Sequence, residues 1–146
     1  MIGGGSQRVL TLGGRLADIV SFNFDNSSGM IGPAGVASSV PELTAKKVQW
    51  VRDGATKAGR PMPELEIGAY FTFVVPDANA MAEGFGKNFG MSAAEVLDYP
   101  HALIGPVDHL CDTIIERREK YGISYITVGD KNAEPFAPVV ARLAGK

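Results

Sequence analysis

The segment Ile2-Gly-Gly-Gly-Ser-Gln-Arg-Val-Leu-Thr-Leu-Gly-Gly-Arg-Leu-Ala-Asp-Ile-Val-Ser-Phe-Asn23 joins a glycine turn, a helix and a short apolar strand. Ser6 is a favourable helix N-cap residue, and apolar residues recur at helical spacing up to Leu16, which predicts a helix over 6–16. The pair Gly13-Gly14 lowers helix propensity by about 1 kcal/mol per residue, and this suggests that a neighbouring backbone comes close there. A strand is expected over 18–24, whereas the strand before the glycines is a stub.

The remainder of the chain continues to alternate between helices and strands. Further helices are expected over 41–58 and 78–90, from the capping-box pattern at Ser92, from about 108 to 121, and over 136–143. Further strands are expected over 65–75 and 123–128. This alternation predicts parallel βα units, hence an α/β fold, in a single domain over 1–146.

The stretch 25–40 is rich in Gly, Ser, Pro and Asn, which predicts a long flexible loop between two regular elements. Loops of this length in a compact domain are usually functional or disordered. Two interpretations therefore stay open for it, a lid over a substrate and a disordered segment.

Composition limits the kind of protein. The chain has 146 residues, of which 45% are hydrophobic and 21% charged, and this is typical of a globular domain with a core. A net charge of -2 argues against nucleic-acid binding, and no apolar run approaches the roughly 20 residues of a membrane span. The lone Cys111 excludes an internal disulfide and favours the cytoplasm.

The glycine turn Gly3-Gly4-Gly5 does not match two well-known phosphate-binding motifs. A dinucleotide fingerprint would require glycine where Arg8 stands, and a P-loop would require a Gly-Lys-Ser/Thr ending. Three glycines at the start of a helix suit an anion, because backbone N–H groups can approach it and the helix N-terminus is partially positive. A tight turn without a ligand explains the same residues equally well.

The segment Gly3 to Asn23 resembles the luciferase-like monooxygenase superfamily, in which a glycine pair after a strand leads into a helix of the Arg-x-Ala-Asp kind. A second similar segment is His101-Ala-Leu-Ile-Gly-Pro-Val-Asp108, which leads into the helix containing Glu116-Arg-Arg-Glu and then the strand 122–128. The resemblance covers nearly the whole chain and is closest to the branch that uses the deazaflavin coenzyme F-420.

This resemblance implies an oxidoreductase with a (β/α)8 TIM barrel and coenzyme F-420 or FMN as cofactor. It places the cofactor phosphate against Gly4 and Gly5, with Gly3 and Ser6 beside them and Asn23 as a polar contact at the end of the next strand. Hydride transfer or monooxygenation of a small organic substrate would be the reaction.

A full barrel takes about 250 residues, so the resemblance covers only its C-terminal half, with three strands and the stub of a fourth. The family's N-terminal half supplies the proton-transfer group and much of the substrate pocket, so no catalytic residue is assigned. Half a barrel leaves strand edges unpaired, and the expected partners are a second copy in a homodimer or an N-terminal barrel half. The alternative function is a half-barrel without catalysis that self-associates or binds a partner.

Other reactive side chains point mainly to structure. His101 could transfer a proton, although a structural or surface role is the more common one for a lone histidine. His109 is expected at the surface and Cys111 in helix packing. Two histidines and one cysteine without regular spacing do not predict a metal site.

Overall fold

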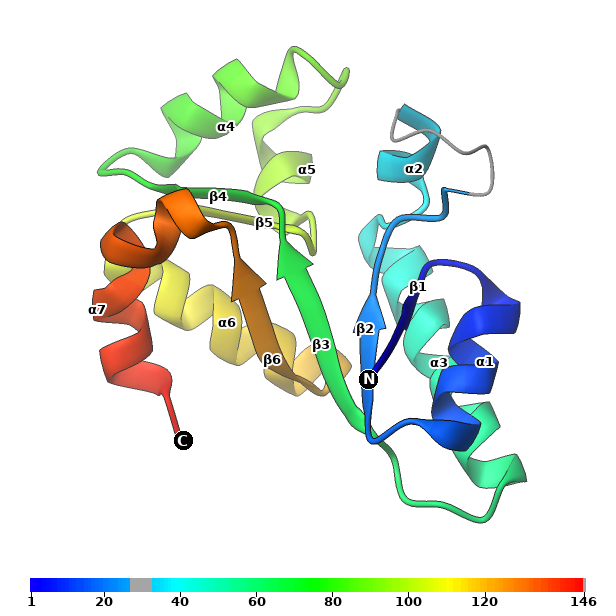
Figure 1. Ribbon diagram of the computed structural model, residues 1–146. Helices are drawn as coiled ribbons and strands as arrows, with labels where there is room; N and C mark the ends of the chain where they lie inside the picture. The colour runs from blue at the N-terminus through cyan, green and yellow to red at the C-terminus, as the bar shows by residue number, and fades with distance from the viewer. Residues whose placement is uncertain (27–32, 146) are drawn as a thin grey trace. The chain divides into compact units, whose positions relative to one another are not determined.

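The computed structural model of the chain describes residues 1–26 and 33–145, which form two compact units. The first unit comprises Met1–Gly68 and Tyr121–Thr127, and the second comprises Ala69–Lys120 and Val128–Lys146. Figure 1 shows the elements of each unit. The units are described in turn, because each has its own sheet.

The first unit contains a four-stranded sheet. Its strands are β1 (Ile2–Gly4), β2 (Ile19–Phe22), β3 (Glu64–Ala69) and β6 (Ile123–Val128), in the order β1-β2-β3-β6. β1 pairs parallel with β2, and β2 parallel with β3. The arrows of β3 and β6 point the same way in Figure 1.

Helices connect successive strands of this sheet. Helix α1 (Gln7–Leu16) joins β1 to β2, and α3 (Pro41–Lys57) lies between β2 and β3. Neighbouring strands are therefore also consecutive strands of the unit, without the reversal of order that a doubly wound sheet has. This confirms the predicted α/β fold, the parallel strands alternating with helices, and the short first strand expected for half of a (β/α)8 barrel.

The sheet has one apolar face and one more polar face. Val20, Phe22, Leu65 and Ile67 are at most 2% exposed and belong to a core with side chains of α1 and α3. Burial of one such side chain contributes about 1.5–3 kcal/mol. The alternate positions Ser21 and Glu66 are paired in register, and their side chains point to the opposite face because strand residues alternate.

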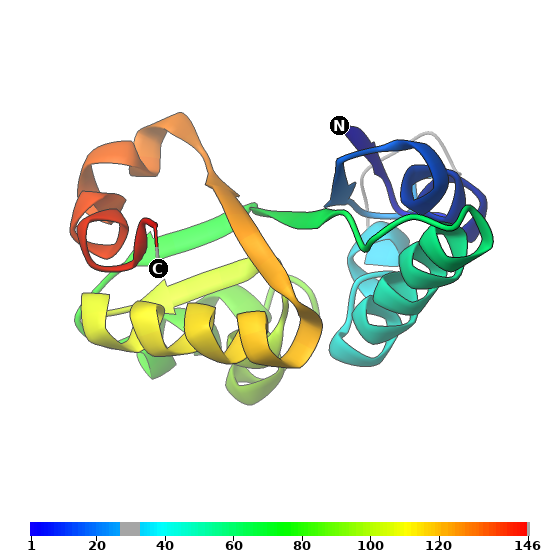
Figure 2. The same cartoon turned by 90° about the horizontal axis from the view of Figure 1, so that it is seen from below.

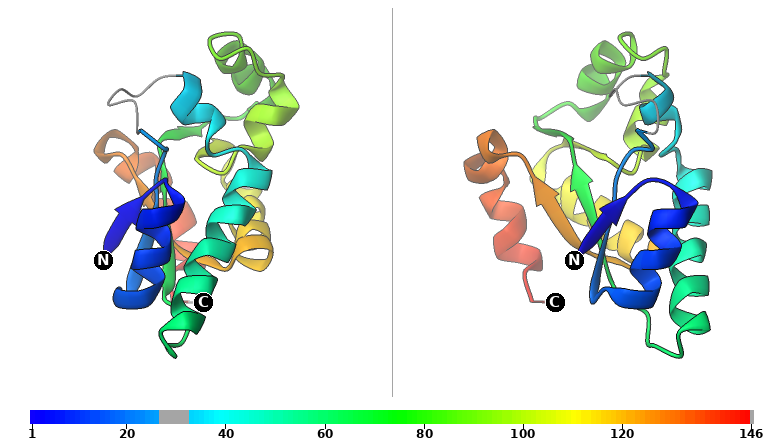
Figure 3. Two further views of the ribbon diagram at one scale, coloured as in Figure 1. Left: turned by 90° about the vertical axis from the view of Figure 1, so that its right-hand side faces the viewer. Right: turned by 45° about the vertical axis from the view of Figure 1, so that its right-hand side comes forward.

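Two glycines let α1 and α3 touch through their backbones. A Cβ added at Gly14 would overlap with the carbonyl of Val51, and one added at Gly54 would overlap with the carbonyl of Thr11. Figure 3 shows the two helices side by side. The close backbone approach suggested by the sequence at Gly13-Gly14 is therefore present, and α3 supplies it.

The second unit contains a parallel pair of strands, β4 (Phe71–Val74) and β5 (Ala102–Gly105), which lie side by side in Figure 2. Its helices are α4 (Ala78–Gly86), α5 (Ala93–Asp98), α6 (Val107–Tyr121) and α7 (Ala133–Leu143), with the short 3-10 helix η1 (Asp130–Asn132) before α7. The predicted capping box is confirmed, since Ser92 and Glu95 cap α5 reciprocally. Within this unit, β4 packs against the rings of Phe85 and Phe89 through Phe71.

The sequence prediction for these strands was partly wrong. A single strand was expected over 65–75, but the structure interrupts it at Tyr70, which is 50% exposed, and β3 and β4 belong to different sheets. Thr72 Oγ1 donates to the Ala69 carbonyl at 2.7 Å across this break. The stretch 65–75 contains no Pro, Asn, Asp or Ser that would predict a turn at Tyr70, and β5, with four residues, was too short to be predicted.

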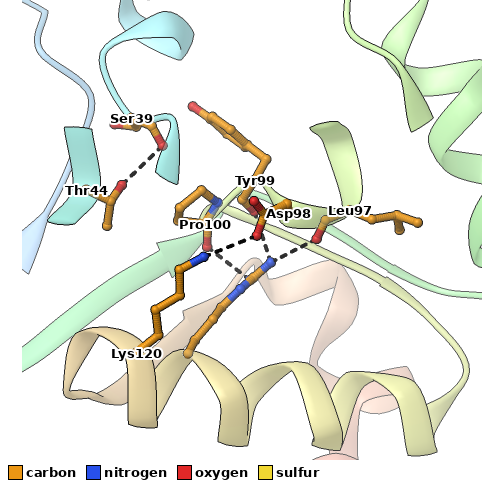
Figure 4. A network of polar contacts seen from close by, with 8 residues as sticks. Ser39, Thr44, Leu97, Asp98, Tyr99, Pro100 and Lys120 are labelled. Atoms are coloured by element: carbon orange, nitrogen blue, oxygen red, sulfur yellow. Dashed lines mark hydrogen bonds and ion pairs between the residues drawn. The ribbon is translucent and has the colours of Figure 1, made fainter. Parts of the chain in front are cut away.

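Arg117 of α6 holds together the connection from α5 to β5. The residue is 6% exposed, and its guanidinium donates to the carbonyls of Tyr99 at 3.0 Å, Pro100 at 3.1 Å and Leu97 at 3.3 Å. Figure 4 shows these carbonyls converging above α6. Since α5 ends at Asp98, the arginine satisfies carbonyls at and just beyond a helix C-terminus, which have no partner within the helix.

The expected loop over 25–40 is not entirely irregular. Residues 33–37 form the short helix α2 (Pro33–Ala37), and the Ser38 N–H donates to the carbonyls of Ala34 and Gly35, both at 3.1 Å. Pro33 suits the first turn of a helix because it has no N–H to satisfy there. The lid and disorder interpretations of 25–40 stay predictions, and residues 27–32 of this stretch lie outside the described residues.

We expect Gly14→Ala to lower the free energy of unfolding by about 2 kcal/mol, because the added methyl group overlaps with the Val51 carbonyl and forces α1 and α3 apart. Gly84→Ala in α4 is the matched control. Its Cβ meets nothing within 4 Å, so the gain of about 1 kcal/mol in helix propensity is not opposed by a clash. Urea unfolding followed by circular dichroism tests both variants, and equal stability of the two would contradict the backbone contact.

Candidate functional site

The five residues predicted to bind the cofactor lie at one end of the sheet of the first unit. Gly3 and Gly4 are the last two residues of β1, Gly5 and Ser6 lead from it into α1, and Asn23 follows β2 directly. The Asn23 N–H donates to the Gly4 carbonyl at 3.0 Å, and a Cβ added at Gly3 would lie 2.9 Å from Asn23 Nδ2. The structure therefore brings Asn23 against the glycine turn at the carboxyl ends of two neighbouring parallel strands, where barrel enzymes bind their ligands.

Packing gives Gly4 and Gly5 a structural reason to be glycine. A Cβ added at Gly4 would lie 2.5 Å from Val9 Cγ1, and one added at Gly5 would overlap with the backbone of Phe24 and Asp25. Gly5 is buried, whereas Gly3 is exposed. The packing by itself thus explains why a tight turn needs glycine at these two positions. Contact of the turn with a phosphate stays a prediction.

The charge at the start of α1 suits an anion. Ser6 occupies the N-cap position with extended backbone angles (φ -91°, ψ 153°), but its hydroxyl makes no capping hydrogen bond, which corrects the predicted capping role. The first turn of α1 contains no acidic residue, and Arg8 there is exposed. Because the N-terminus of a helix is partially positive, the residues present fit a phosphate group on charge.

Lys47 of α3 is a buried cation behind the site that sequence reasoning missed. The residue is 2% exposed, and Nζ donates to the Asn23 carbonyl at 2.8 Å and to Ser39 Oγ at 2.7 Å. Burial lowers the pKa of Lys47 to about 8, against the opposing effect of the negative charge of Asp25. The buried positions Thr44, Lys47, Val48 and Val51 follow helical spacing, and this stripe is the signal that could have identified the residue.

Serine side chains organise the chain between β2 and α3. Ser38 Oγ accepts a hydrogen bond from the Asp25 N–H at 2.8 Å and donates to the Gly35 carbonyl at 2.6 Å. Thr44 Oγ1 donates to the Ser39 carbonyl at 3.2 Å, as Figure 4 shows. The residues around α2 are thus tied both to the end of β2 and to α3.

The polar face of the sheet also contains a buried carboxylate. Glu66 is 4% exposed and accepts a hydrogen bond from Thr127 Oγ1 of β6 at 2.6 Å. In the strand register Glu66 pairs with Ser21, which in turn pairs with Gly3. The row that starts at Gly3 therefore continues in the polar residues Ser21 and Glu66, neither of which was predicted from the sequence as a site residue.

The reactive side chains of the second unit have packing roles. His101 is fully buried and stacks on Tyr70, with ring centroids 5.1 Å apart and planes 7° from parallel. His109 is exposed and Cys111 is buried, both as predicted. Among the described residues no three His, Cys, Asp or Glu side chains are placed to hold a metal ion.

A shallow surface depression of about 540 Å³ lies in the second unit, where β4 leads into α4. Its lining includes Pro76, Asp77, Met81 and Phe85 and none of the predicted site residues. The described helices include none with the length and apolarity needed to cross a membrane.

No protein-family model matches the sequence, and a comparison with curated protein sequences gave no significant match. A comparison with solved structures, by contrast, found enzymes of similar fold. The coenzyme F420-dependent tetrahydromethanopterin reductase from Methanopyrus kandleri superposes with a TM-score of 0.60 at 18% identity, over 97% of this chain and 48% of the reductase.

Two further enzymes superpose on the chain with similar TM-scores. The long-chain alkane monooxygenase LadA superposes with a TM-score of 0.62 at 15% identity, over 97% of this chain and 39% of that enzyme. A riboflavin lyase, RcaE, solved with modified FMN and riboflavin, gives a TM-score of 0.58 at 14% identity, over 96% of this chain and 42% of the lyase. The chain thus spans less than half the length of each of these enzymes.

The chain therefore has the fold of one part of these enzymes, which are an F420-dependent reductase, an alkane monooxygenase and a riboflavin lyase solved with modified FMN. This agrees with the resemblance to luciferase-like monooxygenases deduced from the sequence. At these identities the likeness establishes the fold, and the chemistry of this chain is a separate question.

We expect Gly5→Ala to destabilise the chain by about 2 kcal/mol and Gly3→Ala to be tolerated. The methyl group at Gly5 would overlap with the backbone of Phe24 and Asp25, whereas at Gly3 its one tight contact is with the terminal amide of the Asn23 side chain, which a small shift relieves. Thermal unfolding of the two variants measures the difference. An equal loss of stability in both would show that the turn is not held by the packing described.

Lys47 should make the stability of the chain depend on pH. Its pKa is about 8 in the folded chain and higher in the unfolded chain, so the folded state binds fewer protons between about pH 8 and pH 10.5. The free energy of unfolding of the native chain, relative to that of Lys47→Met, should therefore rise through this range. Lys46→Met, which changes an exposed neighbour, should follow the native curve, and parallel curves for all three proteins would contradict the burial of a titrating amine.

Proposed function

We propose that this chain supplies the cofactor-phosphate site of a flavin- or deazaflavin-dependent oxidoreductase, which acts by hydride transfer or monooxygenation on a small organic substrate. The observation that supports the proposal is the contact of Asn23 with the glycine turn Gly3–Ser6, at the carboxyl ends of parallel strands. Enzymes that share the fold are described as F420-dependent or as bound to modified FMN.

The residues of the turn would divide the binding of the phosphate between them. Gly3 is exposed and leaves its backbone accessible, the Asn23 side-chain amide lies beside it, and the Ser6 hydroxyl is not used for capping. The start of α1 adds partial positive charge. Coenzyme F-420 and FMN both contain a phosphate next to the ribityl chain, and the bound cofactor would supply the redox chemistry, so this site is compatible with either.

The proposed site is one part of an enzyme, because no residue of the chain is assigned to proton transfer. β1 and β6 are the edges of the four-stranded sheet. Leu12 and Leu16 of α1 are 42% and 62% exposed, and the basic residues Arg8 and Arg15 are on the same helix. An N-terminal barrel half, as a separate chain or as part of a longer protein, would extend the sheet from β1 and cover this side of α1.

The same exposed leucines support a second candidate, a half-barrel without catalysis that pairs with a second copy of itself. Light scattering coupled to size-exclusion chromatography separates the two. A stable dimer that lacks affinity for either cofactor favours self-association, whereas a monomer excludes it.

Fluorescence titrations with FMN and with riboflavin, which lacks the phosphate, test the proposed function. We expect FMN to bind weakly but more tightly than riboflavin, and Asn23→Ala to remove most of this difference, since it loses one hydrogen bond worth about 1 kcal/mol or somewhat more when charged. Reduced coenzyme F-420 is titrated in the same way. Addition of the N-terminal half of a structurally similar enzyme should strengthen binding of the cofactor.

Equal affinities for FMN and riboflavin would contradict a phosphate site at the turn. Tight stoichiometric binding with turnover by the chain alone would instead show that the site is complete without a partner.

A further inference from the structure

We propose that Lys47 is the positioning residue of the candidate cofactor site: by binding the carbonyl of Asn23 and the hydroxyl of Ser39, it fixes the Asn23 side chain against Gly3 and links the site to the segment around α2. The relevance of this link for a cofactor rests on the proposed function. The link itself can be measured without any cofactor.

Both backbone polar groups of Asn23 are held, and by different elements. Its N–H donates to Gly4 of β1 at 3.0 Å, and its carbonyl accepts from Lys47 of α3 at 2.8 Å. The N–H and the carbonyl of Asn23 belong to successive peptide units, so the two hydrogen bonds restrain both backbone dihedrals of the residue. The direction in which its side chain leaves the backbone therefore depends on α3 as well as on the strands.

The local surroundings favour an anchoring role for Lys47. The side chain is 2% exposed, and burial of an ammonium group is costly unless hydrogen bonds compensate it, as the two acceptors do here. Among the described residues, Asp25 supplies the charge that acts on Lys47, and it stabilises the protonated form.

Ser39 extends this link beyond the strand. Its hydroxyl accepts from Lys47, and its carbonyl accepts from Thr44 Oγ1, so it is fixed to α3 on two sides. The neighbouring Ser38 binds the Asp25 N–H. A change in the protonation of Lys47 would therefore alter its hydrogen bonds to Asn23 and to Ser39, which lies just after the end of α2.

Amide hydrogen exchange measured by NMR on the full chain tests the link directly. Lys47→Met keeps an unbranched stem and removes the terminal donor, so the Asn23 amide, which bonds to Gly4, should exchange about tenfold faster. Lys46→Met is the matched control and should leave the exchange rate unchanged. The Val20 amide in the centre of the sheet reports that the fold is intact. An unchanged rate at Asn23 in a folded Lys47→Met chain overturns the proposal.

A second measurement covers the case in which Lys47→Met does not fold. In the native chain the Lys47 side-chain methylene signals should titrate near pH 8, and the Asn23 side-chain amide signals should shift with the same midpoint. The Lys46→Met chain should show the same coupled transition. An Asn23 signal that is flat while Lys47 titrates overturns the proposal without any variant of Lys47.

Titration with FMN and riboflavin separates this proposal from the proposed function. If the native chain prefers FMN, Lys47→Met should weaken FMN binding about tenfold and riboflavin binding less, and Lys46→Met should change neither. An unchanged preference in Lys47→Met, with faster exchange at Asn23, refutes the positioning role but not the phosphate site. If the native chain shows no preference, the proposed function fails, and the exchange rates still decide whether Lys47 fixes Asn23.

Discussion

The backbone contact between α1 and α3 is the constraint on which the first unit depends. Gly14 and Gly54 each face a carbonyl of the opposite helix at a separation that no side chain would allow. This contact sets the height of α1 above the sheet, and with it the position of the turn from Gly3 to Ser6. It also places α3 where Lys47 reaches the end of β2. The site residues therefore depend on two glycines that are not part of the site.

Each unit uses one buried cation to hold the chain where a regular element ends. Lys47 binds the carbonyl that follows β2, and Arg117 binds three carbonyls at and after the end of α5. The ends of helices and strands leave carbonyls without partners in the element, and a long basic side chain can satisfy them from a distance. The planar guanidinium of Arg117 has several N–H donors in fixed directions and can therefore bind three carbonyls at once. The ammonium of Lys47 is a compact donor group and binds two acceptors.

The sequence predicted the elements well where their periodicity extended over more than two turns, as in α1, α3 and α6. The grouping of Gly3 to Ser6 with Asn23 was implied by the resemblance to luciferase-like monooxygenases, and it agrees with the rule that the carboxyl ends of consecutive parallel strands meet. The sequence did not predict the break at Tyr70, because no Pro, Asn, Asp or Ser predicts a turn there and Tyr70 and Phe71 themselves favour strands. Lys47 was overlooked beside Lys46 because its acceptors, Asn23 and Ser39, lie 24 and 8 residues away, and only the folded chain brings them together.

The shortness of β1 has a consequence for assembly. An open edge of a sheet is usually a template for any extended peptide, including the same strand of other molecules. β1 spans only Ile2–Gly4, and two of its three residues are glycines without side chains to contribute. Such an edge offers few backbone hydrogen bonds and almost no apolar surface, so it would be a poor seed for the growth of fibrils. A strand that joins it must gain its affinity elsewhere, and recognition at this edge would be selective for a neighbour that also fits the helix layer.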